Sequence, residues 1–224
     1  FFNGMGGACA ALISAMEYYE VSNSGMVPTT GANLAMAAGM VIGSVSFSGS
    51  IIAYLKLEEK LGDIRFTGQQ ILNNAILLGT FVIAGMVVAG MITEFQFIVG
   101  LGILAILFGI LFVFPIGGAD MPVVISLLNS FTGVAAACGG FLYDNKVMLI
   151  GGILVGSAGT ILTIVMTRAM NRSLTNVLFT NFGGDAAGGG SEGPQGTVRS
   201  LSPTDVAVML AYAKNVVVIP GYGL

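Results

Sequence analysis

The sequence predicts an all-α polytopic membrane bundle of about six transmembrane helices, followed by a flexible linker and the first βα turn of a Rossmann-like α/β domain. Composition predicts the bundle: 55% of the 224 residues are hydrophobic and only 8% are charged. Soluble domains carry about 25% charged residues, so this chain lacks the side chains for a water-facing surface. The same composition excludes a disordered chain, and a net charge of −3 without a basic patch excludes a nucleic-acid-binding protein.

Six apolar segments approach the roughly 20 residues that a helix needs to cross the hydrocarbon core of a bilayer. They are 1–19, 32–55, 69–92, 95–114, 121–143 and 147–170. Polar or glycine- and proline-containing stretches separate them, of which Lys56 to Arg65 is the most charged and Thr93-Glu94 the shortest. Residues 1–172 are therefore predicted to form one transmembrane domain.

Most positive charges fall at one end of the predicted bundle. They are Lys56, Lys60, Arg65, Arg168 and Arg172, whereas the opposite end has only Lys146. By the positive-inside rule, the more positive end faces the cytoplasm or the mitochondrial matrix. We therefore expect the C-terminal tail on that side. Arg168 and Arg172 are expected to be interfacial anchors, with binding of phosphate or lipid headgroups as the alternative.

Small residues are frequent in the predicted helices and include Gly152-x-x-x-Gly156, a spacing that lets helix backbones approach closely. Packing alone and an interface that slides both remain open for these glycines. A weak internal repeat relates Asn3-x-x-x-Gly7 to Asn129-x-x-x-Gly133. The two segments are four helices apart and would run parallel, and parallel repeats commonly frame a central pathway.

Asp120 is the acidic residue between the fourth and fifth predicted helices and directly precedes the segment 121–143. An acid at a helix N-terminus can simply cap the helix, with help from the helix macrodipole. Ionisable groups at membrane depth are costly and usually functional, so the alternative is a proton or conformational relay at the mouth of a pathway. The residues alone leave both interpretations open.

Two uncharged polar residues extend this hypothesis into the bundle. Asn129 lies about 13 Å deeper along its helix at 1.5 Å per residue. Its face is predicted to carry Ser126, Thr132 and Gly133, by i±3 and i+4 spacing. Asn3 offers the same chemistry at the corresponding position of the repeat. Such a face can join helices or hold water. Asparagine does not titrate, so a proton path would need the acid described above, or a group outside this chain, to do so.

The C-terminal quarter has a different composition. Residues 173–200 are predicted to form a Gly-rich flexible linker, and 201–224 the truncated start of a nucleotide-binding domain. Ser202-Pro203-Thr204-Asp205 predicts a helix start with Ser202 as N-cap. The apolar, β-branched run 215–219 predicts a strand that leads into Gly221-Tyr222-Gly223, the way a dinucleotide-binding fold begins.

Four ordered segments are similar to one family. They are Gly117 to Val124, Leu128 to Ser130, Ala169 to Ser173, and Val218 to Gly223. Together they resemble the beta subunit of proton-translocating NAD(P) transhydrogenase, or the matching part of a single-chain form. The resemblance implies that the chain, which begins at Phe1, is a fragment. It would hold the later membrane helices and the start of the NADP(H)-binding domain, and by itself it is expected to be inactive.

The reaction implied by the resemblance is hydride transfer between NADPH and NAD⁺, coupled to proton translocation across the membrane. NADP(H) would bind the completed C-terminal domain, with Gly221, Tyr222 and Gly223 at its start, and NAD(H) a domain or subunit absent here. The implied partners are that NAD(H)-binding domain or subunit, the remaining membrane helices, the lipid bilayer and a second copy in a homodimer. The membrane would be the mitochondrial inner membrane or the bacterial plasma membrane.

By position, the resemblance implies that Asp120, Asn129 and Asn3 serve the proton pathway and its coupling. It assigns helix packing in the pathway to Gly152, Gly156, Ser157 and Gly159. Some family members have histidine at the position of Asn3, but this chain has no histidine at all. Because of that departure, a proton path through water and Asp120 is favoured over one through an imidazole. No metal site is predicted.

Two other classes of protein remain as alternatives. Composition alone favours an ion or small-molecule transporter with a short cytoplasmic tail. The predicted strand and Gly-x-Gly argue against it, because a transporter tail need not begin a nucleotide-binding fold. A non-catalytic membrane scaffold would leave Asp120 and the paired asparagines without a role.

Overall fold

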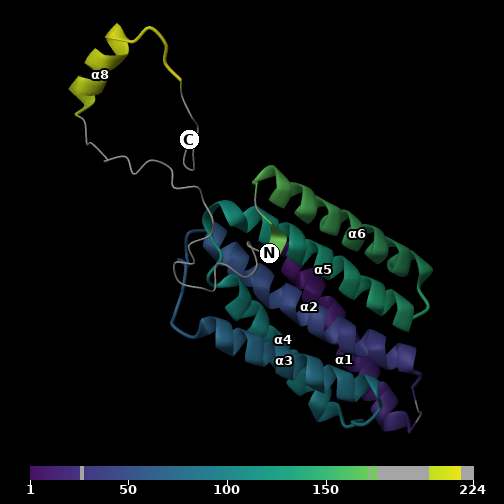
Figure 1. Cartoon of the computed structure of the whole chain (residues 1–224). Helices are drawn as coiled ribbons and strands as arrows, with labels where there is room; N and C mark the ends of the chain where they lie inside the picture. Colours follow the sequence, from purple (N-terminus) through teal and green to yellow (C-terminus); the bar gives the residue numbers. More distant parts are fainter. Residues whose placement is uncertain (26–27, 172, 176–201, 218–224) are drawn as a thin grey trace. The chain divides into compact units, whose positions relative to one another are not determined.

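The structure, a computed structural model, describes residues 1–25, 28–171, 173–175 and 202–217 (Figure 1). The chain divides into two units, Phe1–Gly184 and Asp185–Leu224. The described part of the first unit contains α1 (Phe2–Ser24), α2 (Thr30–Leu57), α3 (Gln69–Val88), α4 (Phe95–Val113), the 3₁₀ turn η1 (Gly118–Asp120), α5 (Met121–Leu142) and α6 (Lys146–Ala169). Each of the six predicted apolar segments overlaps one of these long helices, and α1, α2 and α6 extend beyond the predicted bounds.

Five helices, α2 to α6, are long and apolar enough to cross a bilayer among the residues that the structure describes. The sequence predicts about six, and the helix that falls short is α1. It is long enough but contains Glu17, Glu20 and many glycines and alanines, which contribute little apolar area. Its inward face is nevertheless buried in the bundle, from Gly4 to Tyr18. The chain is an integral membrane protein.

Short connections make consecutive helices antiparallel, and α2 lies at the centre of the bundle (Figure 1). It contacts α1, α3, α4 and α5, whereas α6 packs chiefly on α5 and α3 chiefly on α4. One apolar cluster, which includes Ile52, Val113, Ile116 and Met121, fills the end where α2 and α4 finish and α5 begins. A second cluster around Met36 fills the opposite end.

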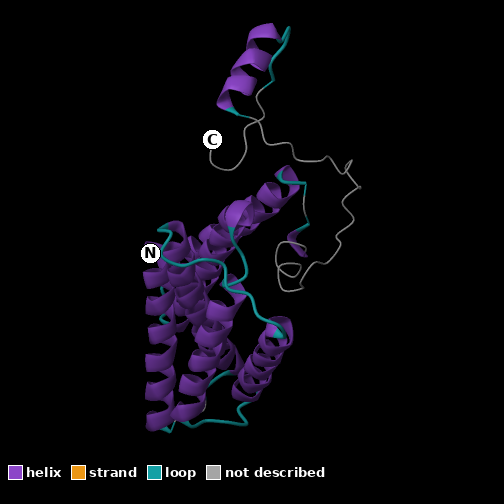
Figure 2. Ribbon diagram, turned by 90° about the vertical axis from the view of Figure 1, so that its left-hand side faces the viewer, coloured by secondary structure: helices purple, strands orange, loops and turns teal. Residues whose placement is uncertain are grey.

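The described part of the second unit contains one helix, α8 (Pro203–Tyr212). Ser202 and Asp205 form a reciprocal capping box at its start, which agrees with the predicted helix start. Residues 215–217, predicted to begin a strand, are not in one, and Figure 2 shows only helices and loops in the described residues. A strand needs a neighbouring strand for its backbone hydrogen bonds, and the described residues supply none. Arg172 and most of the linker lie outside the described residues.

Candidate functional site

Asp120 lies where η1 ends and α5 begins. Gly118 has a positive φ of 58°, which favours glycine, and the Asp120 amide donates to the Gly117 carbonyl at 3.4 Å. Asp120 is only 6% exposed. Its side chain makes no capping hydrogen bond to α5, so a simple helix cap does not account for its place. The turn therefore holds an acidic residue inside one end of the bundle.

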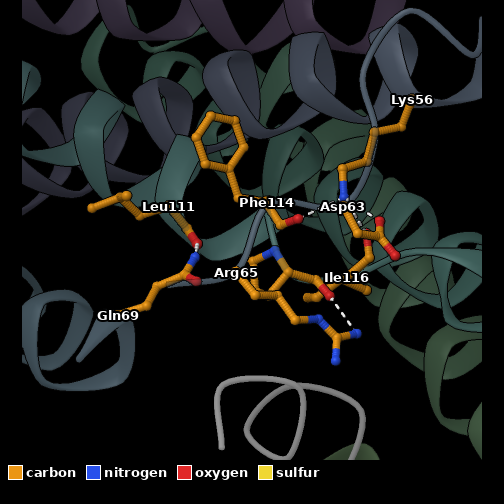
Figure 3. A network of polar contacts seen from close by, with 8 residues as sticks. Lys56, Asp63, Arg65, Gln69, Leu111, Phe114 and Ile116 are labelled. Carbon is orange, nitrogen blue, oxygen red and sulfur yellow. Dashed lines mark hydrogen bonds and ion pairs between the residues drawn. The ribbon is translucent and has the colours of Figure 1, made fainter. Parts of the chain in front are cut away.

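Lys56, one of the positive charges at this end of the predicted bundle, has a buried side chain that is 5% exposed (Figure 3). Its ammonium donates to the Asp63 carboxylate at 2.7 Å, to the Phe114 carbonyl at 2.6 Å and to the Ile116 carbonyl at 2.9 Å. These three acceptors satisfy all three N–H donors of the ammonium. Two of them are carbonyls just past the C-terminus of α4, where the helix macrodipole favours a cation.

Two further side chains bind the α2–α3 connection to α4 and the loop after it (Figure 3). Arg65 donates to the Pro115 carbonyl at 3.1 Å, and Gln69 donates to the Leu111 carbonyl at 3.1 Å. The Asp63 carboxylate packs directly on Gly117, where an added Cβ would collide with it. We call Lys56, Asp63, Arg65 and Gln69 the loop clamp. It fixes the loop that leads to Asp120.

A second polar cluster lies deeper, between α1, α2 and α5. Asn3 donates from its side-chain amide to Ser50 Oγ at 2.9 Å. Ser46 donates to the Leu128 carbonyl at 2.9 Å and shares a short hydrogen bond with Thr132 Oγ1. We call Asn3, Ser46, Ser50 and Thr132 the polar seam. Sequence reasoning missed Ser46, although its i,i+4 spacing from Ser50 places both on one face of α2.

Asn129 does not join the polar seam. An added Cβ at Gly6 would lie 3.0 Å from the Thr132 methyl group, and one at Gly139 would lie 3.6 Å from the Ile13 side chain. Both contacts have the spacing in sequence that separates Asn3 from Asn129. Helices α1 and α5 thus run parallel, with the two asparagines at one depth. Asn3 is half-buried, whereas Asn129 is exposed on the outer surface of the bundle.

The three residues predicted to share the face of Asn129, which are Ser126, Thr132 and Gly133, do not all face the same neighbour. Ser126 is buried and donates to the Gly159 carbonyl at 3.3 Å, so it faces α6. Gly133 also faces α6, whereas Thr132 faces α1 and α2. Positions related by i±3 and i+4 spacing spread over about a third of the circumference of a helix. Because α5 has neighbours on two sides, residues within that third contact different helices.

Glycines allow α5 and α6 to touch through their backbones. An added Cβ at Gly133 would lie 2.5 Å from the Gly156 amide nitrogen, and one at Gly152 would lie 2.5 Å from that of Ala137. Gly159 is likewise buried against α5, at Ser130. Ser157, predicted to pack with them, is exposed. Three of the four predicted packing residues therefore line this interface.

The remaining predicted site residues are not part of the described geometry. Gly221, Tyr222 and Gly223 lie outside the described residues. Among the residues that are described, no group of three or more His, Cys, Asp or Glu side chains could hold a metal ion.

Comparison with known proteins gives one family. A family model described as NAD(P) transhydrogenase beta subunit matches residues 1–224. Two curated relatives, each named NAD(P) transhydrogenase subunit beta and both from Rhodospirillum rubrum, are 38% identical over 233 residues. These matches cover 100% of this chain and 49% of each relative, so the chain spans about half the length of the curated relatives it matches. The chain belongs to the NAD(P) transhydrogenase beta subunit family.

Proposed function

We propose that this chain supplies membrane helices to a proton-translocating NAD(P) transhydrogenase, which couples hydride transfer between NADPH and NAD⁺ to proton movement. Family membership supports the reaction class. The observation that carries the proposal is Asp120, an acid buried at one end of a membrane bundle and joined by α5 to the polar seam. The activity belongs to the complete protein, and we expect this chain by itself to be inactive.

In this proposal Asp120 takes up and releases the proton. The polar seam begins about 13 Å further along α5, at the depth of Asn3 and Asn129. Its hydroxyl and amide groups can both donate and accept hydrogen bonds, so they can order the water that carries a proton without titrating themselves. Coupling requires a two-state element that the proton and the cofactor both bias. We assign that part to η1 and the loop held by the clamp.

The partners follow from the same proposal. NADP(H) would bind the domain that begins within 201–224, and NAD(H) a separate domain or subunit; together they supply the hydride chemistry. Helices outside this chain would cover the face that exposes Asn129, and a second copy would complete a homodimer. The clamp end, which carries Lys56, Lys60 and Arg65, would face the cytoplasm or the matrix.

The test uses the complete protein in sealed vesicles, with NADPH-dependent reduction of an NAD⁺ analogue and lumenal pH recorded together. Asp120→Asn keeps the size of the side chain but cannot titrate, so coupled proton movement should fall at least about a hundredfold. The matched control is Asp144→Asn, since Asp144 is exposed just past the other end of α5 and should change neither rate beyond about twofold.

Three outcomes distinguish the proposed role of Asp120, the transhydrogenase proposal and the transporter alternative. Loss of coupled proton movement in Asp120→Asn alone supports the proposal. Full coupling in Asp120→Asn would remove the proton role from Asp120 while leaving the enzyme activity intact. A wild-type protein with neither hydride transfer nor acidification would overturn the transhydrogenase proposal itself and favour the transporter alternative.

A further inference from the structure

The buried ammonium of Lys56 joins two connections that are far apart in sequence. One is the α2–α3 connection, which supplies Asp63, and the other is the α4–α5 connection, which supplies the Phe114 and Ile116 carbonyls. All three donors of the ammonium are used, and the Lys56 side chain is only 5% exposed. An ammonium placed in this way fixes both loops at one point.

The α4–α5 connection passes from this point to Asp120 within four residues. Ile116 is fully buried in the apolar cluster at this end of the bundle, and Met121 enters the same cluster on the far side of the turn. Between them, Gly117 carries the Asp63 carboxylate against its Cα and accepts the Asp120 amide hydrogen on its carbonyl. A shift of the Phe114–Ile116 carbonyls would therefore move the turn that sets the position of Asp120.

We propose, on the basis of the proposed function, that Lys56 is a positioning residue for Asp120. Its ammonium, with Asp63, holds the α4–α5 loop so that the Asp120 carboxyl stays inside the bundle end, where it couples proton movement to hydride transfer. Lys56 itself neither carries the proton nor touches a cofactor. The competing interpretation is a structural role alone, in which Lys56 only satisfies the C-terminal carbonyls of α4.

The first experiment measures protons translocated per hydride transferred in the complete protein in sealed vesicles. Lys56→Met keeps the apolar stem and removes the ammonium, and we expect the ratio to fall about tenfold. Lys60→Met is the matched control, because Lys60 lies four residues further along the chain but is 60% exposed and pairs with exposed Glu58 at 3.3 Å. Lys60→Met should leave the ratio unchanged, and Lys56→Arg should restore at least about half of it.

A double variant separates positioning from structure. If Lys56 acts through Asp120, adding Lys56→Met to Asp120→Asn should change the residual hydride transfer by less than about twofold. If Lys56→Met lowers hydride transfer equally in the wild-type protein and in Asp120→Asn, the proposal is overturned in favour of a structural role. An unchanged proton-to-hydride ratio in Lys56→Met would overturn it directly.

A labelling measurement keeps the proposal testable without activity. Asp120→Cys, in a background without other accessible cysteines, should react slowly with a small thiol reagent because position 120 is buried. Adding Lys56→Met should speed labelling at least about fivefold, and equal rates would overturn the proposal. If Lys56→Met does not assemble, Asp63→Asn replaces it in both experiments, since Asp63 is 47% exposed and the asparagine side-chain oxygen can still accept a hydrogen bond from the Lys56 ammonium. A wild-type protein without coupled activity would overturn the proposed function, whereas equal labelling rates would overturn only the positioning role of Lys56.

Discussion

Helices α1 and α2 meet through glycine backbones in the same way as α5 and α6. An added Cβ at Gly7 would lie 2.7 Å from the Gly43 carbonyl, and one at Gly152 would lie 2.7 Å from the Gly133 carbonyl. Both hairpins contain the Asn-x-x-x-Gly pattern, and their first helices run parallel at the same depth. The hairpins differ in their asparagines. The Asn3 amide binds Ser50 inside its own hairpin, whereas Asn129 is exposed.

The comparison shows that different residues provide the helix packing and the polar contacts of the bundle. Each hairpin is held by close backbone contact at its glycines, and the α5–α6 hairpin also by hydroxyl hydrogen bonds such as that from Ser130 to the Gly156 carbonyl at 2.7 Å. The contact between the hairpins is made instead by the hydroxyls of Ser46 and Thr132, which can change partners. We therefore expect water and small rearrangements at the polar seam, because its hydroxyl and amide groups can both donate and accept hydrogen bonds. The small residues pack closely within each hairpin, and the sliding interface stays a prediction.

The largest effect is expected from breaking a hairpin. Gly152→Ala would place a methyl group against the Ala137 backbone, which cannot move aside, and should lower the free energy of unfolding by about 1–3 kcal/mol. Gly151→Ala is the control, because an added Cβ there meets nothing within 4 Å. Unfolding of the complete protein in detergent measures both. Equal stability of the two variants would contradict the close contact of α5 with α6.

A smaller effect is expected from opening the polar seam. Ser46→Ala removes the only side-chain donor to the Leu128 carbonyl from α2 that the described residues provide, and should cost about 1 kcal/mol of stability. Ser48→Ala is the comparison, since the Ser48 hydroxyl donates to the Ser44 and Val45 carbonyls of its own helix. We expect Ser46→Ala to slow coupled proton movement more than Ser48→Ala in sealed vesicles. A larger loss with Ser48→Ala would move the pathway away from the seam.

The smallest effect on stability is expected at Asn129. Asn3→Leu loses its hydrogen bond to Ser50 and should destabilise the complete protein by about 1 kcal/mol. Asn129→Leu loses no hydrogen bond to any described residue, so within this bundle it should be neutral to within about 0.5 kcal/mol. If helices outside this chain cover Asn129, the variant will still slow proton movement. Stability and proton movement both at wild-type values would leave Asn129 facing lipid with no role in the pathway.

Local sequence was sufficient to predict the helices and several of their ends. Apolar runs of membrane length, interrupted by polar and glycine-containing stretches, correspond to α2 through α6, because a helix in lipid satisfies its own backbone hydrogen bonds. Ser202 and Asp205 similarly specify the start of α8. The strand predicted at 215–219 is the opposite case. A strand depends on a partner strand, and residues 215–217 have none among the described residues.

Which way each side chain faces was decided by the tertiary structure. Hydropathy placed Lys56 just past the apolar segment 32–55, yet the C-terminus of α4 and Asp63 meet around it and bury its ammonium. Spacing grouped Ser126, Thr132 and Asn129, yet α6 takes the first, α1 and α2 take the second, and no described helix covers the third. The sequence by itself determined the membrane helices, the acid at the start of α5 and the family resemblance. Only long-range packing decided which polar residues meet, because the surroundings of a helix face depend on which helices pack against it.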